Sequence, residues 1–159
     1  MDDKTIRDYI TRYLDWHEAH AHWGDVFRGV PQKAQGTRPK GGPHSPWEIL
    51  EHIRLAQHDI LDFSRNPDYA EKDWPADYWP AKPAPPSPDA WEKSVKAFEK
   101  DLKEMQKLVA DPKTDLEKPI PHGSGQTIMR EALLVADHNA YHLGELVLVR
   151  RLLGCWKET

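Results

Sequence analysis

Two histidines, His138 and His142, stand four residues apart in the segment His138-Asn139-Ala140-Tyr141-His142. On a helix, residues at this spacing lie one above the other on the same face, so both imidazoles can reach one metal ion. The HExxH motif uses the same spacing, but Asn139 stands here where that motif has its glutamate. The segment therefore offers two metal ligands without a general base between them, although in a chain with nine histidines such a spacing also arises by chance.

A third imidazole, that of His52, is predicted to lie on the buried face of another helix, between Ile49 and Ala56. A buried polar ring without a partner costs roughly 1–3 kcal/mol, so His52 needs one. A neighbouring helix or a water molecule would satisfy it by a hydrogen bond. Alternatively, His52 meets His138 and His142 as a third metal ligand, because helix bundles build metal sites from inward-facing side chains of different helices. Three neutral histidines leave a coordination position open, which is typical of catalytic metal sites.

Several other residues are secondary candidates. His17 continues the apolar stripe of the first predicted helix, where a hydrogen-bonded core position is favoured over a role as a fourth ligand or a substrate contact. Asp59 follows His52 by two turns on the same face and serves either the site or a salt bridge. His122 lies in a glycine-rich loop, which is either a plain turn or the mouth of the site. We expect surface or loop positions for the remaining histidines, His20, His22, His44 and His58.

Four helical segments, separated by proline- and glycine-rich connections, are expected to position these residues. The periodicity predicts them over Lys4–Trp23, Pro46–Ser64, Asp89–Ala110 and Thr127–Leu153. The clearest start is at Ser45, which can cap its helix, with Pro46 at the first position and Glu48 completing a capping box. The last segment is apolar on most sides, which suits the most buried helix of a bundle. Gly154 is placed to end it.

The connections differ in length, and the one between the second and third helices is unusual. Gly24–His44 and Asp111–Gln126 are predicted as loops, whereas Asn66–Pro88 carries seven prolines and four large aromatic residues, Tyr69, Trp74, Tyr78 and Trp79. These aromatic side chains either pack down on the helices or form a wall over a ligand site. No segment has a strand period. We therefore predict an all-α fold in a single domain over residues 1–159, a four-helix bundle with a long crossover between helices two and three.

Composition excludes several classes of protein. The 22 Lys and Arg residues against 26 Asp and Glu residues give a net charge of −4, so no nucleic-acid partner is expected. The single cysteine, Cys155, allows neither an intramolecular disulfide nor a Cys-rich zinc module, and its place after the last helix argues against a nucleophilic role. The longest apolar run, Ala132–Ala136, is far short of the ~20 residues of a membrane span. Since the N-terminus carries no leader pattern, we expect a cytoplasmic protein with no membrane partner.

Two segments resemble signatures of the DinB/YfiT-like superfamily. Gly42–His52 is similar to the segment that opens the second helix of that family, and Thr127–Gly144 is similar to its fourth-helix signature, H-x-x-x-H-x-G. The resemblance spans the whole chain and implies a four-helix bundle, usually dimeric, that binds a divalent metal through three histidines. By position these are His52, His138 and His142. Glu145 departs from the pattern, since many relatives have glutamine after the glycine; a carboxylate pointing inward would add negative charge near the site.

The activities implied by this resemblance are transfer or isomerisation reactions that use low-molecular-weight thiols. We expect a metal-dependent S-transferase acting on a small electrophilic substrate, in which the metal lowers the pKa of a thiol. Hydrolysis by a metal-activated water is the nearest alternative, and a non-enzymatic, stress-associated metal-binding homodimer is another. The last alternative is a purely structural histidine cluster. Three imidazoles suit Zn, Ni, Fe and Cu alike, and we favour Zn or Ni.

Overall fold

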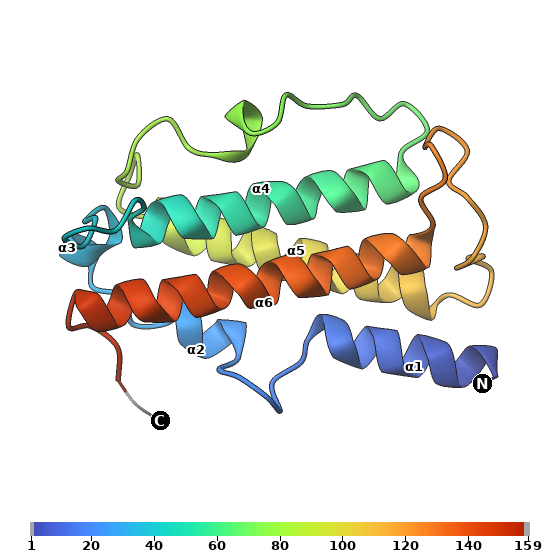
Figure 1. Ribbon diagram of the computed structural model, residues 1–159, viewed down its shortest axis with the longest axis horizontal. Helices are drawn as coiled ribbons and strands as arrows, with labels where there is room; N and C mark the ends of the chain where they lie inside the picture. Colours follow the sequence, from blue (N-terminus) through green and yellow to red (C-terminus); the bar gives the residue numbers. More distant parts are fainter. Residues whose placement is uncertain (1, 158–159) are drawn as a thin grey trace.

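The computed structural model describes residues 2–157, and their secondary structure is helical apart from one isolated bridge between Pro119 and Thr127 (Figure 1). The all-α class is thereby confirmed. The long helices are α1 (Asp3–Leu14), α4 (Pro46–Arg65), α5 (Ala90–Ala110) and α6 (Ile128–Leu152). Short helices α2 (Trp23–Phe27), α3 (Gln32–Gln35) and η1 (Ala76–Tyr78) lie in the connections. No helix of residues 2–157 is long and apolar enough to cross a membrane.

Packing places α4 and α6 beside each other, which decides where a shared site can form. α4 packs against both α5 and α6, and α1 covers the other side of α5 and α6. The hydrophobic core between these helices includes the fully buried side chains of Leu50, Ile53, Phe98, Met105 and Leu146. The two helices that carry the candidate histidines are therefore held together by a packed apolar interior.

Local signals in the sequence placed the ends of three helices within one residue. Ser45 Oγ accepts the backbone N–H of Glu48 (3.2 Å), and Glu48 Oε2 accepts the backbone N–H of Ser45 (2.8 Å), so the predicted capping box opens α4. The guanidinium of Arg38 also pairs with the Glu48 carboxylate. At the end of α6, Gly154 adopts a φ of +66°, and the Cys155 N–H donates to the carbonyl of Arg150 (2.9 Å). This is the Schellman arrangement, which favours glycine.

The prediction of a first helix over Lys4–Trp23 is wrong, because α1 ends at Leu14. After α1, Oδ1 of Asp15 accepts hydrogen bonds from His22 Nε2 (2.8 Å) and Trp23 Nε1 (2.7 Å), which hold the segment between α1 and α2 in a non-helical conformation. A new helix, α2, begins at Trp23, and α3 follows within the segment 24–44 that was expected to be a loop. His17 consequently lies outside the helix and is exposed, not in the core.

Candidate metal centre

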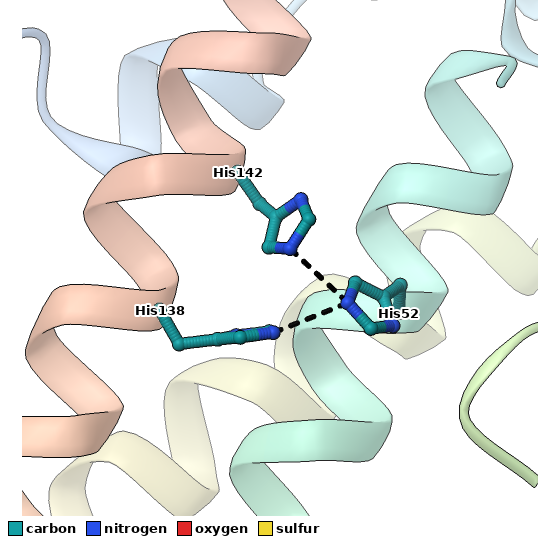
Figure 2. A group of neighbouring side chains, drawn as sticks. All are labelled: His52, His138 and His142. Atoms are coloured by element: carbon teal, nitrogen blue, oxygen red, sulfur yellow. Dashed lines mark hydrogen bonds between the residues drawn. The ribbon is translucent and has the colours of Figure 1, made fainter. Parts of the chain in front are cut away.

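Three imidazoles meet between α4 and α6 (Figure 2). His52 lies in the first half of α4 and is buried, whereas His138 and His142 point toward it from successive turns of α6. The Nε2 atom of His52 lies 3.1 Å from Nε2 of His138 and 3.1 Å from Nε2 of His142. The helix packing thus brings together the three histidines singled out from the sequence, with one nitrogen of each within 4.8 Å of the others.

Hydrogen bonds at the outer nitrogens select the tautomers of two of these rings. Nδ1 of His52 donates to the carbonyl oxygen of Tyr78 (2.9 Å), and Nδ1 of His142 donates to Oε2 of Glu145 (2.8 Å). Because a carbonyl and a carboxylate only accept, each neutral ring carries its proton on Nδ1. The Nε2 lone pairs of His52 and His142 therefore face each other, an arrangement that a shared cation stabilises.

Burial keeps two of the rings neutral. Burial lowers the pKa of His52, outweighing the hydrogen bond to Tyr78, which acts in the opposite direction. Burial also lowers the pKa of His138, to about 3, with further lowering from the neighbouring His142 and His52. A neutral imidazole is the form that binds a metal ion, so these two rings need no deprotonation at neutral pH.

The donor set fits a divalent metal ion. Nitrogen atoms that share one tetrahedral Zn ion at about 2.0–2.1 Å lie roughly 3.3 Å apart, close to the 3.1 Å separations from His52 Nε2. Metal-binding histidines almost always donate their other N–H to a carbonyl, a carboxylate or water, as His52 and His142 do. His138 differs, because its Nδ1 is buried without a hydrogen-bond partner within residues 2–157.

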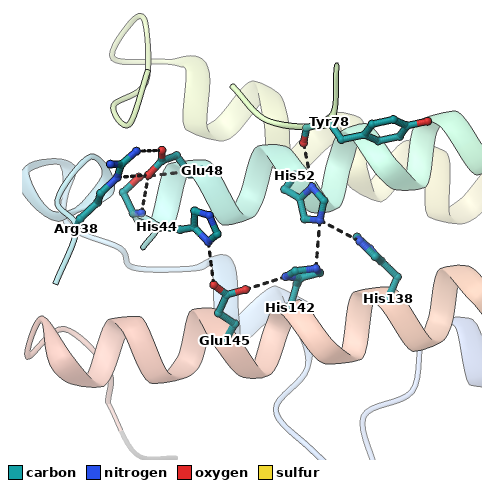
Figure 3. Close-up of polar contacts among 9 residues, drawn as sticks. Arg38, His44, Glu48, His52, Tyr78, His138, His142 and Glu145 are labelled. Carbon is teal, nitrogen blue, oxygen red and sulfur yellow. Dashed lines mark hydrogen bonds and ion pairs between the residues drawn. The ribbon is translucent and has the colours of Figure 1, made fainter. Parts of the chain in front are cut away.

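Glu145 and His44 extend the site away from the three rings (Figure 3). Glu145 lies three residues after His142 on α6, and its other oxygen, Oε1, accepts from Nδ1 of His44 (3.2 Å). The hydrogen bond from His142 lowers the pKa of Glu145; burial opposes this shift, and the bond from His44 adds to it. Glu145 therefore points inward, a possibility that the sequence left open. His44 lies in a loop, as predicted, and it is half-buried in contact with the site.

The long connection between α4 and α5 supplies a cover for His52. The indole of Trp79 stacks on the imidazole of His52 with ring centroids 3.9 Å apart and an interplanar angle of 2°. The same indole also stacks on the imidazole of His44, with ring centroids 4.1 Å apart. Trp74 lies 6.1 Å from His52 and stays largely exposed. Trp79 and Tyr78 therefore pack on α4, and Trp79 at the same time covers His52, so the two interpretations of these aromatic residues do not exclude each other.

A pocket of about 710 Å³ opens beside His138. Its apolar wall includes Phe63, Tyr69, Trp74, Tyr78 and Leu134. Asp59 also lines this pocket. Its carboxylate accepts hydrogen bonds from the hydroxyls of Tyr78 (2.6 Å) and Tyr69 (3.1 Å) and forms an ion pair with Lys72 (3.3 Å). His122 stands at the exposed rim, where Nε2 donates to the carbonyl of Phe63 (2.8 Å). Asp59 thus forms a salt bridge and at the same time faces this pocket.

The remaining histidines and the cysteine lie elsewhere. His22 bonds to Asp15, His58 bonds to Asp101 (2.9 Å), and His17 and His20 contact backbone carbonyls of their own loop. Cys155 follows α6 in the C-terminal segment and is half-buried. None of these five residues reaches the three clustered histidines in the part of the chain that the structure describes.

Comparison with known proteins gives one finding. The model of the DinB superfamily matches residues 15–146, a range that includes His52, His138 and His142. Searches among curated proteins and among solved structures give no match to the chain.

Proposed function

This chain belongs to the DinB superfamily, and we propose that it is a divalent-metal-dependent enzyme joining a low-molecular-weight thiol, through its sulfur, to a small electrophilic substrate. His52, His138 and His142 are the proposed ligands, and Zn or Ni is the proposed ion. The observation that carries the proposal is the convergence of three imidazoles, two of them held with their metal-binding nitrogens facing inward. We further infer that α1, α4, α5 and α6 form one four-helix-bundle domain with the segment 66–89 as its crossover.

The residues around the three histidines suit such a reaction. A divalent ion bound there supplies Lewis acidity, which lowers the pKa of a thiol and so favours the nucleophilic thiolate at neutral pH. Trp79 covers one face of His52 and keeps water from it. The aromatic pocket beside His138 is large enough for a small electrophile and binds its apolar part. Binding both reactants next to each other removes much of the entropic cost of their encounter.

Transfer is favoured over hydrolysis by the state of the two carboxylates near the site. Glu145 accepts N–H groups from His142 and His44, which lower its pKa and make it a poor base. Asp59 accepts two tyrosine hydroxyls and an ion pair from Lys72. Neither group is placed as a dedicated general base for water. Hydrolysis through a metal-activated water is the alternative that an activity panel tests.

Metal content and activity of purified variants test the proposal. We expect wild type to bind one equivalent of a divalent ion and to turn over a thiol with an electrophile, and His138→Ala to lose both. His58→Ala is the matched control, because His58 is an exposed histidine on α4 that bonds to Asp101 away from the site. A wild-type protein without stoichiometric metal would refute the proposal. Full loading without turnover across a thiol and electrophile panel would favour a non-enzymatic metal-binding dimer.

We also propose that the chain forms a homodimer through the outer face of α6. Leu133, Tyr141, Leu148 and Leu152 are large exposed side chains along this face. Gly144 lies between them, and a Cβ there would meet nothing within 4 Å. In an antiparallel pairing centred on Gly144, Asp137 of one copy faces Arg151 of the other, since each stands seven residues from that glycine.

Light scattering measures this association directly. We expect a dimer at micromolar concentration for wild type and a monomer for Leu148→Glu, which places a charge in the apolar stripe. A monomeric wild type would contradict the dimer without affecting the metal site.

A further inference from the structure

Glu145 is shared by two imidazoles that come from different parts of the chain (Figure 3). Its Oε2 accepts Nδ1–H of His142 at 2.8 Å, and its Oε1 accepts Nδ1–H of His44 at 3.2 Å. His142 stands on the same helix, one turn earlier, whereas His44 belongs to the loop that precedes α4. Each oxygen of the carboxylate thus has an imidazole donor, which fixes the rotation of the carboxylate as well as its position.

His44 is itself held in place by the connection between α4 and α5. Its ring stacks on Trp79 at 4.1 Å, and the same indole stacks on His52 at 3.9 Å. His52 then lies 3.1 Å from His142 through their Nε2 atoms. The contacts form a closed ring of five side chains, in the order His52, Trp79, His44, Glu145 and His142. The proposed ligands His52 and His142, which stand on different helices, are therefore connected a second time, through the other three side chains of this ring.

A carboxylate at this position changes what His142 can do. A neutral imidazole has two tautomers of similar energy in water, and only the Nδ1–H form leaves Nε2 with a free lone pair. The Glu145 carboxylate stabilises that form before any metal arrives, and its negative charge makes the ring a stronger donor. Without an acceptor at Nδ1, part of the population would carry the proton on Nε2, which would have to be lost on metal binding.

We propose that Glu145 is the positioning residue for the proposed ligand His142 and that His44 holds Glu145 in that role. This inference rests on the proposed metal site. A purely structural alternative is that the carboxylate only joins the loop before α4 to α6. The alternatives differ in their consequences, since a structural tie affects unfolding, whereas a positioning residue affects the tautomer of His142 and the affinity for metal in the folded protein.

The experiment compares wild type with three variants. The readouts are the affinity for Zn²⁺, by competition with a chromophoric chelator, and the tautomer of His142 in the metal-free protein, by ¹⁵N NMR of the imidazole. For Glu145→Ala we expect about 10–100-fold weaker binding and a mixture of tautomers. Glu145→Gln keeps an oxygen that accepts Nδ1–H, so it should keep the tautomer and lose less than about tenfold. His44→Phe keeps a ring to stack on Trp79 but removes the donor, and we expect a loss of about 3–10-fold.

Glu92→Ala is the matched control, because it removes an exposed carboxylate from α5 that is not part of the three-histidine cluster. Its affinity should equal that of wild type. Unchanged affinity and an unchanged His142 tautomer in Glu145→Ala would overturn the inference, as would equal losses in Glu145→Ala and Glu92→Ala. If wild type itself binds no Zn²⁺, the proposed function fails, but the tautomer of His142 in the metal-free variants still decides the positioning role. If Glu145→Ala does not fold, His44→Phe decides, since a Zn²⁺ affinity equal to that of wild type in this variant would overturn the inference.

Discussion

Asn139 occupies the position that distinguishes this helix from a metalloprotease helix, and its side chain points into the core. Its Nδ2 donates to Oε1 of Gln57 (2.8 Å), and Nε2 of Gln57 donates to the backbone carbonyl of Phe98 (2.7 Å). Both amide side chains are buried. The pair therefore joins α6, α4 and α5. Asn139 therefore makes a hydrogen bond between helices at the position where the HExxH motif has its catalytic glutamate.

Replacing Gln57 by leucine tests this role. The change leaves Asn139 Nδ2 buried without a partner, while the Phe98 carbonyl loses one donor but keeps its helical bond within α5, so we expect the free energy of unfolding to fall by about 1–3 kcal/mol. Urea denaturation followed by circular dichroism measures it. Zn²⁺ affinity should change much less than in Glu145→Ala, because Gln57 contacts no proposed ligand. A loss below about 0.5 kcal/mol would show that the buried amides find other partners or water.

At the scale of helices, the sequence predicted starts and ends well where a local signal exists. Ser45, Pro46 and Glu48 are adjacent in sequence, so the capping box of α4 could be recognised without knowing the fold. The end of α1 could not, because the apolar spacing continues to His17, whereas hydrogen bonds to Asp15 from His22 and Trp23, farther along the chain, hold the segment after α1 in a non-helical conformation. Periodicity reports which face of a helix is buried and does not report a tertiary turn.

The contact between α4 and α5 includes a charged group whose pH dependence can be predicted. Burial raises the pKa of Glu51, but hydrogen bonds from Arg54 and Ser94 outweigh it and hold the pKa below the ordinary 4.5. As the pH falls below about 4.5, Glu51 is therefore protonated in the unfolded chain before it is protonated in the folded protein. The folded protein loses stability in this pH range. Glu51→Gln should be less stable at pH 7 by about 2 kcal/mol and should lose less on acidification. Denaturation at pH 7 and pH 3.5 measures both; equal acid sensitivity in the two proteins would contradict the assignment.

At the scale of the whole molecule, the site joins segments that no local pattern connects. His52 falls on the buried face of one predicted helix, and His138 and His142 share one face of the helix predicted to be most buried. That these three histidines meet could therefore be predicted. Trp79 and His44 could not, because the backbone of a proline-rich connection and of the loop before α4 is set by tertiary contacts such as the His52 hydrogen bond to Tyr78. In consequence, the sequence predicted the three histidines that cluster but not the residues that cover and orient them.

These joins predict that metal binding orders the connection as well as the helices. A ligand that binds only the folded state adds stability of about 2.7 kcal/mol at a hundred times its dissociation constant. Here the added stability should reach residues 74–79, because His52 stacks on Trp79 and donates to the carbonyl of Tyr78. Hydrogen exchange with and without Zn²⁺ should show slower exchange in this segment and in α4 and α6. In Trp79→Ala, Zn²⁺ should still slow hydrogen exchange in α4 and α6 but should slow it less in residues 74–79. If exchange of residues 74–79 in wild type does not depend on Zn²⁺, the cover and the site are not linked. The segment 111–118, none of whose residues lines the pocket beside His138, serves as the internal control.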